Sequence, residues 1–511
     1  MSGGKSLTLG QDTFSALSIS DLCIKDSALL AIDKNTFSKM ESLSTLEVKN
    51  ILSISVDNSL LHLPNLRSLH ISNTKLKFDQ FFSDGESSMD DLRFENCDLD
   101  VLREDLINHL KSLTTLSLAF NRLSSLPSES MRNLHYLQEL NIENNRFGNI
   151  PHSSINGQLR ALNLASNDLS RLDADSFGQK NLLITTLNMS RNSLKVIGER
   201  VFYAVQEVEV LDLSHNVIQA VVIDAFSKLL KLAQIFLGYN KLLFIPNALF
   251  NSNLKHLVFI DVAHNPITRI REDLSVSSEV TSLSHLMISK TNLSILTSQD
   301  FIGFPKVMQL TLSNNKVSRI SPGAFGSLRI LQMLDLSHNL LEIVPSERLS
   351  GLFNLRSLNL SRNDLTRLNK FGKNHKQLDQ LDISYNKLTK IFSWNFNPLV
   401  QLNVLLAHHN QITWIDKDAF ENLTSLQDLD ISHNKLAHID GGFLDPIESS
   451  LEMLIIKEYE FIPIKLQICT ENKRVRSIEG EYLNSIYTLS MVYGLWSIEE
   501  QQIFFILRNA G

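Results

Sequence analysis

The hexapeptide LDLSHN stands at residues 211–216 and returns letter for letter at 334–339, and LDISHN follows at 429–434. Each copy holds an Asp, a Ser and a His, the side chains of a hydrolase triad. A working triad places the His between the Ser and the Asp and adds an oxyanion hole. One short extended strand sets the Asp and the Ser side by side instead, and a catalytic site is rarely present three times. We therefore expect no enzyme activity and interpret the hexapeptide as part of a repeat.

The repeat becomes visible when the chain is aligned with itself on the frame LxxLxLxxNxL. Nineteen frames, 22 to 26 residues apart, span residues 14–461. Thirteen of them carry Asn at the N position, and we call these the Asn ladder: Asn121, Asn145, Asn167, Asn192, Asn216, Asn240, Asn265, Asn315, Asn339, Asn363, Asn386, Asn410 and Asn434. The other six frames carry Ser27, Ile51, Thr74, Cys97, Thr291 and Tyr459 at this position.

This frame and its period resemble the leucine-rich repeat. The resemblance implies an α/β solenoid, a curved horseshoe of about nineteen repeats with a parallel inner β-sheet. Three segments follow from it: residues 1–13 as a partial repeat, residues 14–461 as the repeat array, and residues 462–511 as a tail outside the repeat.

The alternation within one frame predicts which side chains form the core. Leu211 and Leu213 point inward, whereas Asp212 and Ser214 point to the concave surface. Stacking the strands in parallel pairs their backbone groups and buries a continuous ladder of leucines. The Asn of the frame turns inward, where its amide satisfies backbone groups of the turn. We therefore predict that the Asn ladder is structural.

The second half of several repeats carries the pattern A-F-x-x-L-x-x-L, which predicts a phenylalanine spine on the convex side through Phe226, Phe325 and Phe420. This spacing resembles the "typical" repeats of extracellular proteins such as chaoptin, the Toll receptors and Slit. The long array without internal cysteine caps is most similar to chaoptin-like adhesion proteins. The resemblance implies an extracellular or cell-surface protein whose concave face binds a protein ligand or a homophilic partner. Two alternatives stay open: an ectodomain fragment of a Toll-like receptor, and an intracellular scaffold that regulates a partner enzyme.

Composition and cysteine usage exclude several classes of function. The 511 residues include 48 basic and 55 acidic ones, a net charge of −7, which argues against a nucleic-acid binder. Cys23, Cys97 and Cys469 form no CxxC or metal spacing, so we expect free thiols, no metal and no cofactor. The sequence shows no signal peptide, membrane-spanning segment or lipid-anchor signal to support the expected location.

Aspartates recur at one concave position of the frame, and each is followed three residues later by a His or a Tyr. A string of such residues could bind a metal or sense pH, but we favour a solvated hydrogen-bonding face. The intervening repeats carry other residues, so no two aspartates are direct neighbours across the ladder. The pairs are Asp212 with His215, Asp261 with His264, Asp335 with His338, Asp382 with Tyr385, and Asp430 with His433.

Part of the concave face is unusually apolar for exposed positions. Four Asn-x-Ser/Thr sequons are glycosylation candidates, at Asn188, Asn292, Asn359 and Asn422. Asn188 and Asn359 are expected on the concave face, where a glycan would obstruct binding, and the apolar stretch lies between them. Aromatic and Met side chains are favoured interface anchors, although local packing without a partner is an alternative. The partner-binding candidates are Phe236, Tyr239, Val258, Phe259, Met287 and Met308.

Overall fold

The computed structural model describes residues 7–11, 13–25, 29–78, 87–178, 181–271, 280–436 and 442–456. The predicted tail, residues 462–511, lies outside the described residues, as do Ser27 and Tyr459 of the frame and Cys469.

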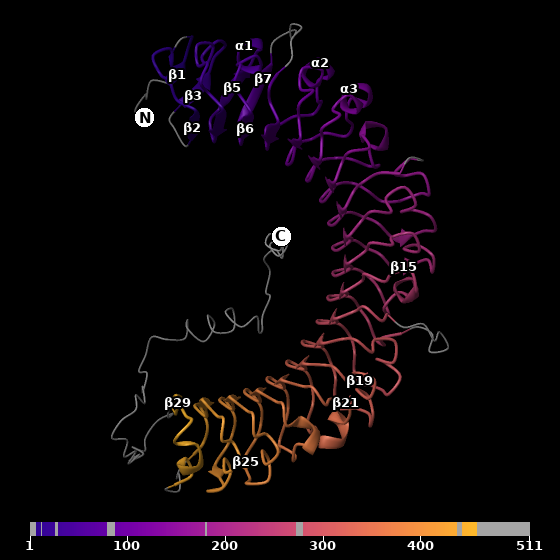
Figure 1. Ribbon diagram of the computed structural model, residues 1–511, viewed down its shortest axis with the longest axis vertical. Helices are drawn as coiled ribbons and strands as arrows, with labels where there is room; N and C mark the ends of the chain where they lie inside the picture. The colour runs from indigo at the N-terminus through magenta and orange to yellow at the C-terminus, as the bar shows by residue number, and fades with distance from the viewer. Residues whose placement is uncertain are drawn as a thin grey trace, which may run out of the picture.

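Nineteen parallel strands of the described residues form one inner sheet and follow one another in chain order along an arc (Figure 1). Each strand belongs to one frame of the repeat, so the predicted solenoid is confirmed. The strands are β2 (Asp21–Lys25), β4 (Thr45–Lys49), β6 (Ser68–Ser72), β8 (Asp91–Glu95), β9 (Thr115–Ser117), β10 (Glu139–Asn141), β11 (Ala161–Asn163), β12 (Thr186–Asn188), β14 (Val210–Asp212), β16 (Gln234–Phe236), β17 (Phe259–Asp261), β18 (His285–Met287), β20 (Gln309–Thr311), β22 (Met333–Asp335), β23 (Ser357–Asn359), β24 (Gln380–Asp382), β26 (Val404–Leu406), β28 (Asp428–Asp430) and β29 (Met453–Ile455).

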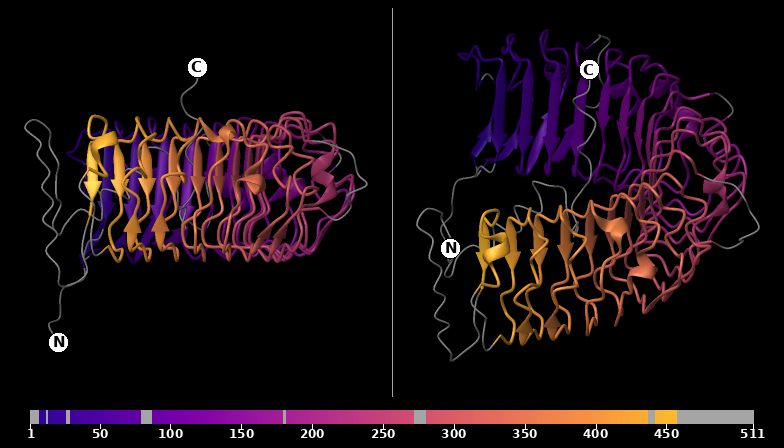
Figure 2. Two further views of the ribbon diagram at one scale, coloured as in Figure 1. Left: turned by 90° about the horizontal axis from the view of Figure 1, so that it is seen from below. Right: turned by 60° about the horizontal axis from the view of Figure 1, so that its bottom comes forward.

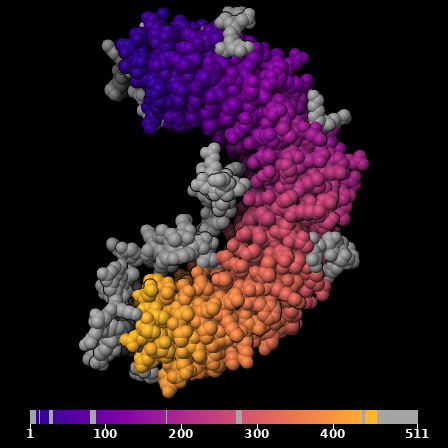
Figure 3. Space-filling view, viewed as in Figure 1, coloured from indigo at the N-terminus to yellow at the C-terminus, as the bar shows by residue number. Residues whose placement is uncertain are grey.

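Successive inner strands pair without a register shift, so equivalent positions of the frame stand in columns. Leu211 pairs with Ile235, and Asp212 pairs with Phe236. The strands therefore lie side by side along the whole arc. The right-hand view of Figure 2 shows this most clearly towards the two ends of the array. The concave face of the molecule is the inner rim of this band (Figure 3).

The outer side of the arc consists of short strands and single helical turns. At the N-terminal end, four outer segments pair as a second parallel sheet in the order β1 (Leu7–Leu9), β3 (Leu29–Ile32), β5 (Ser53–Val56) and β7 (Lys75–Phe78). Three two-stranded pairs follow: β13 (Val196–Ile197) with β15 (Ala220–Val221), β19 (Ile295–Leu296) with β21 (Arg319–Ile320), and β25 (Lys390–Ile391) with β27 (Trp414–Ile415). The helical turns are α1 (Asn58–Leu61), α2 (Glu104–Ile107), α3 (Ser128–Arg132), η1 (His152–Ser154), η2 (Asn247–Phe250), η3 (Ser346–Leu349), η4 (Lys373–His375) and η5 (Asp445–Ile447).

The core between the two sides is a leucine ladder backed by phenylalanines. Leu211 and Leu213 are fully buried. The predicted phenylalanine spine is present as separate groups, each formed by phenylalanines of neighbouring repeats. Phe226 stacks on Phe202 at a centroid distance of 5.9 Å, and Phe325 stacks on Phe301 at 5.8 Å. Phe420 packs at 6.3 Å from Phe396. All of these phenylalanines are buried, which fixes the spacing of the repeats from the convex side.

Candidate concave binding face

The His of LDLSHN is a turn residue. His215, Tyr239 and His264 have φ angles of 52°, 55° and 57°, in the left-handed region that disfavours most side chains. The same conformation occurs directly before the N position in seventeen frames. Asn and His, which are enriched among non-glycine residues in this region, hold most of these positions. The seventeen residues are Asn50, Asn73, Asn96, Phe120, Asn144, Ser166, Arg191, His215, Tyr239, His264, Lys290, Asn314, His338, Arg362, Tyr385, His409 and His433.

The ladder Asn joins two neighbouring repeats at this turn. In the middle of the array, Asn339 Nδ2 donates to the carbonyl oxygens of Leu312, Leu336 and Ser337 at 2.9, 3.0 and 3.1 Å. Its Oδ1 accepts from the backbone N–H of Val317 at 2.9 Å. The side chain is buried, so these four hydrogen bonds take the place of water for groups of both repeats.

The Asp of LDLSHN caps the same turn. Asp335 Oδ1 accepts from the backbone N–H of Ser337 at 2.8 Å, and Asp212 accepts in the same way from Ser214. Asp335 is only 4% exposed, so this position is less solvated than the sequence suggested. Burial raises the pKa of Asp335 to about 6, against hydrogen bonds from Ser337 and Ser313 that lower it. Burial also raises the pKa of Asp382.

This raised pKa gives a prediction on stability. Because the folded pKa of Asp335 lies above the unfolded value of 3.8, its contribution to stability is fully present below pH 4 and is lost as pH rises through 6. Asp335→Asn keeps the turn hydrogen bond, as native Asn359 does with Ser361. We expect the variant to be more stable than the parent at pH 7.5, by about 1–2 kcal/mol, and equal to it near pH 4. Urea unfolding at both pH values measures the difference, and a gain that is the same at both would contradict the assignment.

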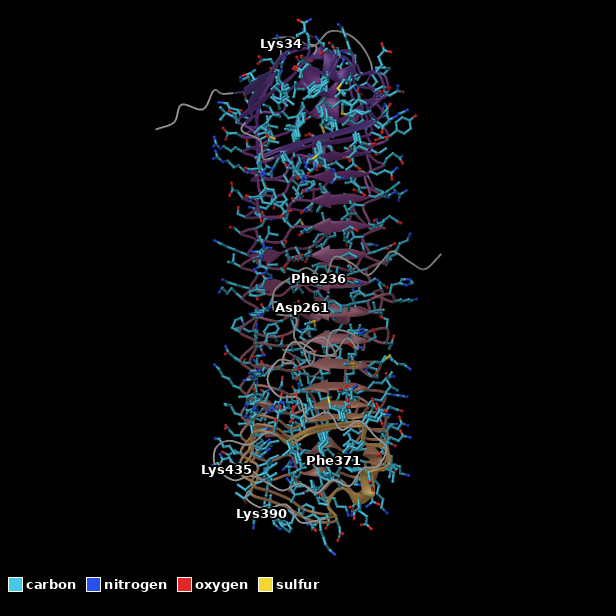
Figure 4. All side chains as sticks on the ribbon, turned by 90° about the vertical axis from the view of Figure 1, so that its left-hand side faces the viewer. Lys34, Phe236, Asp261, Phe371, Lys390 and Lys435 are labelled. Atoms are coloured by element: carbon cyan, nitrogen blue, oxygen red, sulfur yellow. The ribbon has the colours of Figure 1, made fainter. Side chains whose placement is uncertain are left out.

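Two aromatic side chains meet on the concave surface of β16 and β17. The Phe236 and Phe259 ring centroids are 5.2 Å apart, and the Phe259 ring lies 6.4 Å from that of His285 on β18. Phe236 shares a column with Asp212, Asp261 and Met287, whereas Phe259 belongs to the column of Gln234 and His285. The ring contact therefore joins two neighbouring columns. Both phenylalanines are half-buried. We call Phe236, Phe259, His285 and Met287 the concave aromatic patch. Figure 4 labels its member Phe236 and, on the neighbouring repeat, Asp261.

The other three candidate residues, Val258, Met308 and Tyr239, differ in exposure and in their contacts. Val258 is the most open, at 38% exposed, and Met308 is half-buried at the equivalent position two repeats further on. Tyr239 belongs to the row of turn residues, where its ring stacks between those of His215 and His264 at centroid distances of 4.0 and 3.7 Å. The structure thus brings the rings of Phe236 and Phe259 together and places Met287 on the next strand, beyond Asp261 in its column. Tyr239 belongs to a separate stack at one edge of the sheet.

Sequence reasoning missed a second stack of turn residues. The Arg362 guanidinium carbon lies 4.0 Å from the centroid of the Tyr385 ring, which stacks on His409 at 4.2 Å. His433 continues the row at 4.1 Å from His409. The pKa of His409 is lowered to about 4 by burial and by the neighbouring His433 and His408. Only the left-handed turn, which the leucine frame does not reveal, makes these rings neighbours.

The sequon asparagines differ in their surroundings. Asn359 is 5% exposed, and its Oδ1 accepts from the Ser361 N–H at 2.8 Å, so its amide is the least suited to carry a glycan. Asn188 makes the same turn with Ser190 at 3.0 Å but is only half-buried. Asn292 accepts from Lys316 Nζ, and Asn422 lies outside the inner sheet beside Asn397.

Metal-binding and membrane-spanning features are absent from the described residues. Within those ranges no group of three or more His, Cys, Asp and Glu side chains could hold a metal ion. No helix in the same part of the chain has the length and apolar character needed to cross a bilayer. Cys97 is buried at the N position of its frame, where its Sγ donates to the carbonyl oxygens of Ile71 and Glu95, and burial raises the pKa of this thiol to about 12.

Comparison with protein families confirms the repeat. The Leucine rich repeat family matches residues 87–147, 157–218, 183–242, 206–267, 305–365 and 401–457, more than half of the chain. The chain belongs to the leucine-rich repeat family. A related family, the BspA type Leucine rich repeat region, matches residues 5–89, the part where the outer segments form the second sheet.

The relatives of this leucine-rich repeat protein include podocan-like proteins and Toll-like receptors. Podocan-like protein 1 of Mus musculus is 30% identical over 61% of the chain and 55% of its own length. Toll-like receptor 3 of Bos taurus is 28% identical over 52% of the chain and 31% of its own length. The chain spans about half the length of the curated relatives it matches first.

Solved structures share the fold. The TLR13–ssRNA13 complex matches with a TM-score of 0.61 at 23% identity, covering 86% of this chain and 69% of that one. The Toll–Spatzle complex of Drosophila matches with a TM-score of 0.63 at 17% identity, covering 83% and 57%. At these identities the likeness extends to the leucine-rich repeat solenoid alone.

Proposed function

We propose that this leucine-rich repeat protein is a non-enzymatic scaffold that binds a protein ligand on its concave face, over β16 to β20. The concave aromatic patch carries the proposal. Most other inner strands hold a polar side chain in the column of Phe236 and Met287, with Leu406 and Ile455 among the apolar exceptions. On β16 and β17 the rings of Phe236 and Phe259 meet, and Met287 follows on β18. Large apolar side chains in water do not help the solenoid fold, and aromatic clusters of this kind form the centres of protein interfaces.

The relatives support an extracellular or cell-surface setting for this ligand recognition. Their names include podocan-like protein 1 and Toll-like receptor 3, and the Toll–Spatzle complex shows a similar solenoid together with a protein. The sequence-based resemblance to chaoptin adds a narrower form of the proposal, in which the ligand is a second copy of the chain and the function is adhesion. Both forms use the same concave surface.

The proposal predicts that Phe259→Asp weakens binding without unfolding the protein. Burying one large apolar anchor is worth about 1.5–3 kcal/mol, so we expect at least a tenfold rise in Kd. The melting temperature should change little, because Phe259 faces away from the leucine core. The ligand is first sought by screening the chain against an array of secreted and cell-surface ectodomains that includes the chain itself. Surface plasmon resonance then measures each binder.

A matched control variant is Phe353→Asp, since Phe353 is a 48% exposed phenylalanine outside the inner sheet. It should bind like the parent. If every ligand of the array binds Phe259→Asp normally, or if only Phe353→Asp loses affinity, the concave aromatic patch is not the binding surface. Loss of self-association in Phe259→Asp alone would favour the adhesive form.

A further inference from the structure

Asp261 differs from Asp335 and Asp382 of the same column in what its carboxylate contacts. The carboxyl of Asp335 is hydrogen-bonded by the Ser337 and Ser313 hydroxyls, and that of Asp382 by the Ser384 and Ser361 hydroxyls. Each receives one hydroxyl from its own turn and one from the preceding repeat. At the two places equivalent to these serines, Asp261 has Ala263 and Gly238, which offer no hydroxyl.

One oxygen of Asp261 is consequently left for another group. Among the described residues its hydrogen-bond donor is the backbone N–H of Ala263, which reaches Oδ1 at 2.7 Å. A Cβ added to Gly238 would stand 3.2 Å from Oδ2. Oδ2 therefore lies over the place where a side chain at position 238 would be. Oδ2 is open to a donor or a cation from outside the chain, and a half-buried carboxylate is stabilised when such a group pairs with it.

The surroundings of this oxygen are aromatic and apolar. Phe236 and Met287 flank Asp261 in the same column, and the Phe259 ring lies against Phe236. In the space-filling and side-chain views this part of the sheet faces the hollow of the arc (Figures 3 and 4). A carboxylate beside ring faces fits a Lys or Arg side chain, which can pair with the charge while its stem or guanidinium packs on a ring.

We propose that Asp261, Phe236 and Phe259 together bind a cationic side chain, a Lys or an Arg, that a protein ligand presents beside apolar residues. This inference rests on the proposed function and names the chemistry of the ligand at the centre of its surface. In low dielectric a pair between this carboxylate and a guanidinium is stronger than a pair at the rim of an interface. Asp335 and Asp382, whose carboxylates already accept two serine hydroxyls each, do not offer such a site.

The site has a pH dependence with a definite sign. Burial, with a smaller effect from Asp212 on β14, raises the pKa of free Asp261 to about 6. The other titratable groups on the adjoining repeats are Tyr239 after β16, His264 after β17 and His285 on β18. A bound cation lowers the pKa of the carboxyl, so affinity is complete above pH 7 and falls as pH drops through 6. We expect about a tenfold loss between pH 7.5 and pH 5.

The test uses a phage-displayed library of random twelve-residue peptides selected on the full chain at pH 7.5. We expect the selected peptides to share a Lys or Arg next to apolar residues. Their synthetic forms should bind Asp261→Asn at least tenfold more weakly than the parent, and replacing their Arg by neutral, isosteric citrulline should cause the same loss. Asn is compatible with this position, because Asn188 and Asn359 make the same turn hydrogen bond in their own repeats.

Asp335→Asn is the control for the loss of one concave charge, and it should bind the peptides normally. A selection that enriches no basic peptides, or basic peptides that bind Asp261→Asn normally, overturns the inference. The proposed function fails separately. Apolar peptides that lose binding to Phe259→Asp but not to Asp261→Asn would refute the cation site and leave the concave aromatic patch as a binding surface. Peptides that bind Phe259→Asp and Asp261→Asn as well as the parent would refute both the cation site and the concave aromatic patch as a binding surface.

Discussion

Asn339→Ala is expected to destabilise the middle of the array by about 3–5 kcal/mol, one of the largest effects of any single truncation in this protein. The variant leaves the buried N–H of Val317 without an acceptor and removes the amide donor from the carbonyls of Leu312 and Leu336. Each unsatisfied buried group costs about 1–3 kcal/mol. Since the bonds join two neighbouring repeats, unfolding should also become less cooperative around β20 and β22.

The measurement is equilibrium urea unfolding, with hydrogen exchange to locate the weakened repeats. Asn354→Ala is the matched control. Asn354 is half-buried and donates one solvent-exposed hydrogen bond, from Nδ2 to the carbonyl of Arg329 at 2.7 Å. The loss of this bond should cost less than about 1 kcal/mol. Equal stability of Asn339→Ala and the parent in a monomeric sample would contradict the structural role of the Asn ladder.

The leucine frame predicted the solenoid because it reports the part of the fold that depends only on local pattern. Leu211 and its equivalents Leu334 and Leu429 each occupy the centre of an inner strand, and all three are buried. When repeats with a period-2 alternation about every 24 residues stack as parallel strands, every leucine of the frame is buried on one face of the sheet. The inward direction of the ladder asparagines followed from the same frame, whereas the phenylalanines predicted as one spine form separate groups.

The properties of the concave side chains were harder to predict, because they depend on neighbours from other repeats. Asp335 was expected in a solvated face and is almost fully buried. The frame gives the direction in which a side chain points, whereas its exposure depends on the side chains in the columns beside it. His215 was assigned no role in the turn, although the Asn residues at equivalent positions 50, 73 and 144 were a readable signal of a left-handed backbone.

The contacts of the concave aromatic patch were also only partly predictable from the sequence. Phe236 and Phe259 were chosen from the sequence because large residues replace polar ones there, and the structure brings their rings together. Tyr239 was chosen on the same ground, yet it stacks with turn histidines. The unused acceptor of Asp261 depends on Gly238 one repeat earlier, a relation that appears only once the columns are in register.

Phe325→Ala is expected to cost about 3–5 kcal/mol, the usual range for removing a buried phenylalanine. The side chain is fully buried on the convex side and stacks on Phe301. The backbone around it has little room to close the cavity, because a Cβ on neighbouring Gly351 would already stand 3.1 Å from the Phe325 carbonyl oxygen and 2.9 Å from Gly326 Cα. A site that cannot collapse keeps both the transfer cost and the cavity cost.

In a solenoid each repeat contacts only its neighbours, so a cavity at one repeat weakens two interfaces and leaves distant ones intact. Phe325→Ala should therefore unfold in two steps, with hydrogen exchange faster near β20 and β22 than near β10. Phe353→Ala, which truncates a 48% exposed phenylalanine, should keep the parent's single transition. Uniformly faster exchange along the whole chain would show that the array unfolds as one unit and that the phenylalanine pairs do not set its local stability.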